Sequence, residues 1–281
     1  MTFRTTPRPL DPTISIVVPA RNEAKNLEII LPLLKDFHEV ILVDGNSVDG
    51  TVETALRLLP GIKVVHQTRK GKGNALACGF EAATGDIIVM FDADCSADSE
   101  EIPRFIEALT NGADVAKGSR NREGGGSADI TLIRGLGNKG LNLVCNVLLG
   151  THYTDLCYGY NAFWADILPA LDLLPSTAKA PADGSMLWGD GFEIETILTC
   201  RMAAAKLRVT EVASYEQLRV HGTSNLNAVS DGIRVLKTII DEKRRDTVNV
   251  GQLRRAARLA PAAQRATVSA SSSSSRAQDV A

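Results

Sequence analysis

Apolar runs alternate with helical repeats along the first 110 residues of the chain. The runs are short and rich in β-branched residues, and they cover residues 14–19, 40–43, 62–66 and 87–91. Between the first two runs, apolar residues recur at the spacing of one helix face, at Leu27, Ile30, Leu31 and Leu34. Apolar runs separated by helices are typical of strands that are buried on both faces of a parallel sheet. The pattern therefore predicts four successive strand–helix units.

Such a succession implies right-handed crossovers and an α/β fold, which is a Rossmann-like, open, mainly parallel sheet with helices on both faces. Ligands bind such sheets at the carboxyl ends of the strands. The dinucleotide fingerprint G-x-G-x-x-G does not follow the first predicted strand, which argues against NAD or FAD.

The second half of the chain has a less regular pattern. We expect strands at residues 114–120 and 208–220, and helices over 130–149, from 190 to about 205, and from about 229 to 245. The helix over 130–149 is amphipathic. Burial of its apolar face against the sheet is the simpler interpretation, and contact with a membrane surface is left open. The glycine-rich residues 121–129 are a candidate mobile lid.

This pattern predicts one domain over residues 13–245, with halves at 13–110 and 111–245. The polar, proline-rich residues 1–12 and the Ala/Arg/Ser-rich tail 246–281 are predicted to be disordered.

Composition and charge narrow the class of protein. The chain has 281 residues, of which 44% are hydrophobic, and a net charge of −2, so nothing favours nucleic acid as a partner. No stretch of about 18 apolar residues occurs, which excludes a membrane-spanning helix from our expectations. The five cysteines form no CxxC pair and the start resembles no signal peptide, so we expect free thiols and a cytoplasmic location.

Two carboxylates, Asp92 and Asp94, come directly after the apolar run 87–91. Hard divalent cations prefer oxygen ligands, and Mg²⁺ is commonly held by one or two carboxylates together with substrate phosphates. The pattern is therefore typical of a metal site. The alternative is that the two acids only begin a loop and cap a helix.

The loop after the third run has the sequence Arg69-Lys70-Gly71-Lys72-Gly73 and precedes a predicted helix. Glycines allow the backbone to approach an anion, and helix N-termini and lysines favour negative charge, so the loop suits a diphosphate. The alternative is a solvated basic loop. Because Arg21, Asp44, Lys70, Asp92 and Asp94 all follow predicted strands, one crevice is expected to collect them.

Two later segments also carry candidate chemistry. The aromatic stretch from Tyr153 to Trp164, which includes Asp155, is either core or one wall of a sugar or acceptor site. Asp190 stands before a predicted helix, where it is either an N-cap or a functional acid.

Four motifs occur in order at these strand ends: Val18-Pro19-Ala20-Arg21-Asn22-Glu23, Val43-Asp44-Gly45-Asn46-Ser47-Val48-Asp49-Gly50-Thr51, Lys70-Gly71-Lys72-Gly73 and Phe91-Asp92-Ala93-Asp94. Together they resemble the family 2 glycosyltransferases of GT-A fold, and within them the dolichol-phosphate and polyprenol-phosphate mannosyltransferase group. The resemblance covers roughly residues 13–242, and it makes 13–110 the nucleotide-sugar-binding half and 111–245 the acceptor-binding half.

The resemblance implies an inverting transfer of a hexose from a nucleotide-diphosphate sugar, GDP-mannose or UDP-glucose, with Mg²⁺ or Mn²⁺ as cofactor. It implies a metal site at Asp92 and Asp94 and an acceptor-phosphate site at Arg120 and Arg134. The donor-binding residues that it implies are Pro19, Arg21, Glu23, Leu42, Asp44, Lys70, Lys72, Asp92, Ala93, Asp94 and Arg219.

The chain departs from the family pattern at three positions. Ser96 stands where a glutamine often completes the metal site, Asn225 where a lysine is usual, and Gly45 where a second acid often follows Asp44.

Two acceptors stay open from the sequence. A polyprenyl monophosphate needs arginines and no strong base, because it arrives ionised. A soluble hydroxyl acceptor needs a carboxylate about 3 Å away to take its proton, for which the candidates are Asp155, Asp190 and Glu193. Peripheral association with the cytoplasmic membrane face is compatible with the first acceptor. A third hypothesis is a non-catalytic nucleotide-sugar-binding protein.

Overall fold

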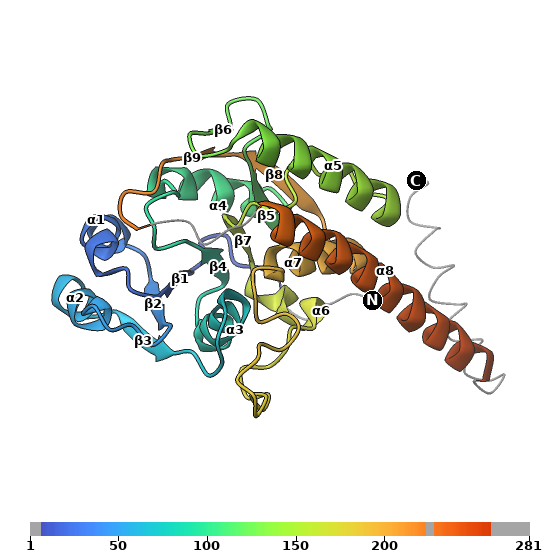
Figure 1. Ribbon diagram of the computed structural model, residues 1–281, viewed down its shortest axis with the longest axis horizontal. Coiled ribbons are helices and arrows are strands. Elements are labelled where there is room, and N and C mark those ends of the chain that lie inside the picture. The colour runs from blue at the N-terminus through green and yellow to red at the C-terminus, as the bar shows by residue number, and fades with distance from the viewer. Residues whose placement is uncertain (1–6, 223–227, 260–281) are drawn as a thin grey trace. The chain divides into compact units, whose positions relative to one another are not determined.

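The computed structural model describes residues 7–222 and 228–259 and has a seven-stranded central sheet (Figure 1). The strand order is β3-β2-β1-β4-β7-β5-β8. The strands are β1 (Ile14–Ala20), β2 (Glu39–Asp44), β3 (Lys63–His66), β4 (Ile87–Met90), β5 (Val115–Ser119), β7 (Asn161–Trp164) and β8 (Val209–Ala213). All neighbours pair in parallel except β7, which is antiparallel to β4 and β5. The predicted open, mainly parallel sheet is confirmed.

The helices alternate with the strands in the first half, as the apolar pattern predicts. The α-helices of the whole described chain are α1 (Ala24–Leu34), α2 (Thr51–Leu58), α3 (Lys72–Ala82), α4 (Ile102–Thr110), α5 (Leu132–Leu149), α6 (Leu168–Leu171), α7 (Ile194–Ala204) and α8 (Ala228–Leu259). Two 3-10 helices, Ser99–Glu101 and Ala165–Ile167, precede α4 and α6.

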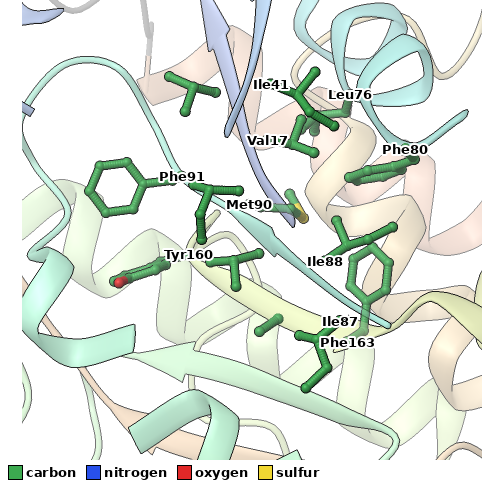
Figure 2. Packing of buried hydrophobic residues seen from close by; sticks show 14 of the residues in the cluster. Val17, Ile41, Leu76, Phe80, Ile87, Ile88, Met90, Phe91, Tyr160 and Phe163 are labelled. Carbon is green, nitrogen blue, oxygen red and sulfur yellow. The ribbon is translucent and has the colours of Figure 1, made fainter. Parts of the chain in front are cut away.

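Strand β7 was not predicted. It lies in the aromatic segment from Tyr153 to Trp164, for which the sequence left two interpretations, part of the core or one wall of a binding site. All four of its residues are buried. Side chains three apart point to opposite faces of a strand, and accordingly Phe163 meets Phe80 of α3 edge-on at 5.2 Å while Tyr160 stacks on Phe105 of α4 at 4.6 Å. Figure 2 shows Phe80 and Phe163 together on one side of the sheet and Tyr160 and Phe91 on the other. Helices therefore cover both faces.

A second, two-stranded sheet joins β6 (Gly126–Ser127) to β9 (Tyr215–Glu216). The strand predicted over 208–220 is thus divided between β8 and β9. The glycine-rich segment that we considered as a lid contributes β6. Its backbone N–H groups donate hydrogen bonds from Gly126 to Ser214, just before β9, and from Ala128 to Glu216 of β9.

The ends of the described chain differ from the expected disorder. Arg8, within the segment 1–12, donates hydrogen bonds to Asp166 and Asp114 and lies over the ring of Trp164 at 4.8 Å. Helix α8 extends beyond residue 246 to Leu259, since this stretch is rich in helix-forming residues. Residues 1–6 and 260–281 lie outside the described chain.

The chain forms two compact units, one through Ile239 and one from Ile240 onward, with the boundary inside α8. The expected division into two halves at residue 110 falls within the first unit. Among the residues that the structure describes, no helix is both long and apolar enough to cross a membrane.

Candidate active site

A cavity of about 670 Å³ opens at the carboxyl ends of β1, β3, β4 and β5. It brings together most of the side chains that the sequence predicted for the site, namely Pro19, Arg21, Glu23, Lys70, Lys72, Asp92, Ala93, Asp94, Arg120, Arg134 and Arg219. Among the described residues, the cavity lining leaves out five predicted ones: Leu42, Asp44, Asp155, Asp190 and Glu193.

Asp94 is paired with a cation inside the cavity. Nη2 of Arg219 lies 2.6 Å from Oδ2 of Asp94, and Nη1 of the same guanidinium lies 3.5 Å from Oε1 of Glu23. The other oxygen of Asp94 accepts a hydrogen bond from the backbone N–H of Ser96 at 3.0 Å. Burial raises the pKa of Glu23 above its usual value. Asp94 and Glu23 are thus two closely spaced carboxylates that share the guanidinium of Arg219.

Lys72 connects three segments that are distant in sequence. Its ammonium lies 2.8 Å from Oδ1 of Asp92 and 2.8 Å from Oε1 of Glu195, in the first turn of α7. Burial alone would lower the pKa of Lys72, but the two carboxylates hold it above its ordinary value. A Cβ at Gly159 would lie 3.2 to 3.4 Å from all three charged groups, so the glycine leaves room for the cluster.

Asp92 and Asp94 could supply part of the ligands of a hard divalent cation. Asp92 and Asp94 both line the cavity and offer carboxylate oxygens. Within residues 7–222 and 228–259, no group of three His, Cys, Asp or Glu side chains converges as a metal site. A bound cation would therefore take its remaining ligands from water and from the diphosphate, as Mg²⁺ commonly does.

The glycines of the loop at 69–73 serve a purpose that the sequence did not reveal. A Cβ at Gly71 would lie 2.0 Å from the carbonyl oxygen of Asp190, and a Cβ at Gly73 would lie 1.9 Å from that of Gly189. The N–H groups of Gly73 and Asn74, at the start of α3, donate to the carbonyl oxygen of Asp190. Protein backbone therefore already occupies these two N–H groups, while Lys70, Gly71 and Lys72 line the cavity, so binding of a diphosphate by this loop stays a prediction.

Asp190 is buried and paired. Its carboxylate receives two hydrogen bonds of 2.8 Å from Arg69, and both side chains are at most 3% exposed. Arg69 also donates to the carbonyl groups of Pro175, Ser176 and Ala178, so it holds residues 175–190 against the loop that precedes α3.

Glu193 is also turned to the protein, because its carboxylate accepts hydrogen bonds from the N–H groups of Gly189 and Gly191. Neither Asp190 nor Glu193 reaches the cavity as a base.

Asp155 is fully buried below the cavity wall. Its two oxygens accept hydrogen bonds from Nε and Nη2 of Arg120 at 2.7 and 3.0 Å, and Nδ2 of Asn138 donates to Oδ1 at 2.9 Å. Although burial opposes ionisation, Arg120 and Lys117 hold the pKa of Asp155 below its usual value. Asp155 therefore positions Arg120.

Arg120 itself lines the cavity. The guanidinium donates a third hydrogen bond to Glu216 at 2.9 Å, and it lies 4.8 Å from the ring centre of Tyr158. Of the predicted aromatic wall, Tyr158 lines the cavity, whereas Tyr160, Phe163 and Trp164 belong to the core.

Arg134 lies in the first turn of α5, which Thr131 caps by accepting the N–H of Arg134. Its Nη1 is 3.2 Å from Asp129, and the arginine side chain is 29% exposed. The salt bridge is at the surface, where such pairs are worth little, so the guanidinium can exchange Asp129 for a stronger anion at low cost.

Strand β2 places neither of its two predicted donor-binding residues, Leu42 and Asp44, in the cavity lining. Leu42 is fully buried in the core. The carboxylate of Asp44 accepts the N–H groups of Asn46 and Ser47 and thereby shapes the turn after β2. A Cβ at Gly45 would already lie 3.1 Å from Cβ of Arg21, so a larger residue would push on that arginine. Asn225 lies outside the described residues.

Sequence reasoning missed four carboxylates that line the cavity, namely Asp129, Glu195, Glu216 and Asp231. Glu195 stands two residues after Glu193, and the sequence did not indicate which of the two faces the site, because the helix begins between them at Ile194. Glu216 belongs to β9, a strand too short to give a periodic signal.

Comparison with known proteins identifies the class of enzyme that this fold and cavity define. Residues 15–171 match the model of the family described as glycosyl transferase family 2, and the chain belongs to that family. It is a glycosyltransferase with the GT-A fold, as the four motifs predicted.

Two curated relatives are similar over much of the chain. The undecaprenyl-phosphate mannosyltransferase of Micrococcus luteus is 33% identical over 206 residues, which cover 70% of this chain and 80% of that protein. The dolichol-phosphate mannosyltransferase of Pyrococcus furiosus is 33% identical over 172 residues, which cover 58% of this chain and 49% of that protein. The match therefore spans about half the length of the Pyrococcus protein.

Solved structures with the same fold include glucosyl-3-phosphoglycerate synthase from Mycobacterium tuberculosis. Its complex with Mn²⁺, UDP and glucosyl-3-phosphoglycerate has a TM-score of 0.63 and 23% identity, with 82% of this chain and 80% of that chain covered. A complex of the same enzyme with Mg²⁺ and UDP has a TM-score of 0.63 and 22% identity, with 82% and 79% covered. At these identities the likeness shows the fold alone.

Proposed function

We propose that this glycosyltransferase moves a hexose from GDP-mannose or UDP-glucose to a polyprenyl monophosphate. The observation that carries the proposal is the position of α5. Arg134 and Leu141 of this helix line the cavity, while Leu136, Leu143 and Val147 of the same helix are 64% to 73% exposed. One helix thus offers a cation to a phosphate inside the cavity and apolar side chains to a lipid phase outside.

The apolar part of the cavity supports a lipid acceptor. Leu141 of α5 and Val235 of α8 line it together with Met186 and Phe192, which are 44% and 43% exposed. Large apolar side chains at an open rim are unfavourable in water and suit an isoprenoid chain. The two named relatives that are mannosyltransferases act on prenyl phosphates, which supports the same class of acceptor.

In the proposed reaction, an oxygen of the acceptor phosphate attacks C1 of the donor sugar. The new bond joins C1 to that oxygen, the bond between C1 and the donor diphosphate breaks, and the nucleoside diphosphate leaves with the electron pair. The configuration at C1 inverts. The phosphate oxygen is already ionised, so no proton has to be removed. The placement of Asp155, Asp190 and Glu193 outside the cavity is compatible with a reaction that needs no base.

The charged side chains that line the cavity define the proposed donor end. Lys72 and Arg219 would stabilise the negative charge that develops on the leaving diphosphate, because preorganised cations act strongly in a shielded site. Asp92 and Asp94 would hold Mg²⁺ or Mn²⁺, which supplies Lewis-acid stabilisation to the same diphosphate when bound. Arg21 and Glu23, after β1, would contact the nucleoside.

A soluble acceptor is the second candidate, and one observation favours it. Glu195 lines the cavity beside Lys72, so a carboxylate is available there to take a proton from a hydroxyl group. The fold neighbours include an enzyme whose titles name phosphoglyceric acid and glucosyl-3-phosphoglycerate.

A transfer assay separates the two. The enzyme is incubated with radiolabelled GDP-mannose or UDP-glucose and Mn²⁺, with undecaprenyl phosphate, undecaprenol or 3-phosphoglycerate as acceptor. We expect label in the organic phase with undecaprenyl phosphate only, and none after addition of EDTA. Label on the free alcohol, or only in the aqueous phase with 3-phosphoglycerate, would contradict the proposal.

Arg134→Ala tests the acceptor side of the same assay. Loss of a charge-assisted contact of about 1.5–3 kcal/mol should raise the KM for undecaprenyl phosphate at least about tenfold. Lys139→Ala removes an exposed cation from the same helix and should leave this KM unchanged. Equal KM values for Arg134→Ala and wild type would exclude a phosphate clamp at Arg134.

A further inference from the structure

One carboxylate competes for the arginine that faces the acceptor side of the cavity. Oε2 of Glu216 receives a hydrogen bond from Nη1 of Arg120 at 2.9 Å and another from the hydroxyl group of Ser127. Arg120 and Glu216 both line the cavity, and the glutamate side chain is 19% exposed. A single carboxylate oxygen thus sits at the cavity wall between two donors.

The two carboxylates that bind Arg120 are not equivalent. Asp155 is fully buried, forms a two-pronged pair with the guanidinium and is held by Asn138 from below. Glu216 accepts a hydrogen bond from Nη1, the guanidinium nitrogen that Asp155 does not bind. Removal of Glu216 would leave Arg120 positioned by Asp155, with Nη1 directed to whatever anion enters.

The backbone of β9 does not depend on the Glu216 side chain. Its main chain is held by pairing with β6, by the carbonyl of Glu216 accepting the N–H of Ala128, and by the N–H of Gln217 donating to Ser96. The side chain can therefore leave Arg120 without separating the two strands.

We infer that Glu216 occupies the position of the acceptor's anionic group and determines which acceptors can enter. An incoming group has to displace a carboxylate of charge −1 from a guanidinium and a hydroxyl. A phosphate monoester carries about −1.5 to −2 at neutral pH and has three acceptor oxygens, so it can do so. A neutral hydroxyl cannot. Glu216 thus excludes neutral acceptors and lowers the affinity for phosphate itself.

This inference rests on the proposed function, because it requires an acceptor with a phosphate group. It predicts an unusual outcome: replacement of a cavity residue should tighten binding of the acceptor. Geranyl phosphate is a suitable probe, since it is a water-soluble prenyl monophosphate, and geraniol is its uncharged counterpart.

Binding of both probes is measured by calorimetry for wild type, Glu216→Gln and Glu216→Ala, without donor. Since a hydrogen bond to a charged group is worth about 1.5–3 kcal/mol, removal of the competitor should lower the Kd for geranyl phosphate about tenfold or more. The Kd for geraniol should fall much less, because a neutral hydroxyl gains no charge-assisted hydrogen bond from the released guanidinium. Glu123→Gln is the matched control, because Glu123 is an exposed glutamate in the segment before β6 and should leave both values at wild-type level.

Thermal unfolding shows whether each variant is folded. Two different substitutions at position 216 are made so that the test can proceed if one of them fails to fold. If wild type transfers sugar to undecaprenyl phosphate but both variants bind geranyl phosphate no tighter than wild type, this inference alone is wrong. If wild type uses only acceptors without phosphate, the proposed function fails, and the inference fails with it.

Discussion

Nη2 of Arg219 lies 2.6 Å from Oδ2 of Asp94, so the cation proposed for the donor diphosphate is paired with a carboxylate proposed for the metal. Binding of a divalent cation at Asp94 has to compete with this pair. Arg219→Ala should therefore increase the affinity for Mn²⁺ in the absence of nucleotide while it lowers the rate of transfer about 10²–10³-fold, the usual cost of losing one charge-stabilising donor.

The two effects are measured by Mn²⁺ titration under electron paramagnetic resonance and by kcat in the transfer assay. Arg122→Ala, which removes an exposed arginine outside the cavity lining, serves as control. Weaker Mn²⁺ binding in Arg219→Ala would show that the arginine supports the metal site instead of competing with it.

Asp190→Asn should lower stability more than catalysis. The substitution leaves the buried guanidinium of Arg69 without its charge partner, and breaking a buried pair by removal of one member costs about 3–5 kcal/mol. Urea unfolding should show this loss, whereas kcat per folded molecule should stay near wild type. Asp183→Asn, in an exposed part of the same connection, should change stability little. A large fall in kcat with normal stability would restore Asp190 as a base.

Gly73→Ala and Gly140→Ala should have opposite effects on stability. A Cβ at Gly73 would lie 1.9 Å from the carbonyl oxygen of Gly189, which requires the backbone of one segment to shift. A Cβ at Gly140, in the interior of α5, would meet no atom within 4 Å. The first variant should be destabilised, and the second stabilised by about 0.5–1 kcal/mol because alanine loses less backbone entropy in a helix. Denaturant unfolding compares them directly.

We call the contacts of Arg8 with Asp114, Asp166 and Trp164 the Arg8 anchor. The stability that this anchor contributes should depend on pH. Although burial opposes ionisation, Arg208 and Arg8 hold the pKa of Asp114 well below its usual value of about 3.9. A carboxylate with a lowered pKa contributes stability above its unfolded-state pKa, and that stability is lost as the pH falls through the acid range. Arg8→Ala should therefore unfold more easily than wild type at pH 7, and the difference should shrink below about pH 4.

Arg57→Ala is the control for the Arg8 anchor. It removes an ion pair with Glu28 whose side chains are 60% and 58% exposed, so little stability should be lost at either pH. A difference between Arg8→Ala and wild type that is constant from pH 7 to pH 3 would show that the anchor acts through packing on Trp164 alone.

The exposed apolar residues of α5 should bind a lipid surface. Leu143→Asp combined with Val147→Asp places two charges on this face and should reduce flotation with liposomes of acidic phospholipid several-fold, because each buried apolar side chain contributes about 1.5–3 kcal/mol. Leu56→Asp, on α2, is the control for a charge at another exposed leucine. Unchanged flotation would exclude α5 as the contact, while turnover of geranyl phosphate in solution should be the same in all variants.

The sequence determined the parallel strands of the first half and the residues at their carboxyl ends. Local patterns carry this information, because apolar runs of strand length are recognisable without knowledge of their neighbours and the carboxyl ends of parallel strands meet at one edge. Of the residues expected in one crevice, the cavity lining leaves out Asp44 and includes Arg21, Lys70, Asp92 and Asp94.

Only the tertiary structure decided which charged side chains of the second half face the cavity. Strand β7 enters the sheet between β4 and β5, and this non-local pairing has no local periodic signal. It places Asp155 in the interior under Arg120, while the start of α7 turns Glu195 to Lys72 and leaves Glu193 on backbone amides. A buried charge requires a partner, and the partners of these acids come from segments far away in sequence. Their roles therefore depend on contacts that exist only once the chain is folded.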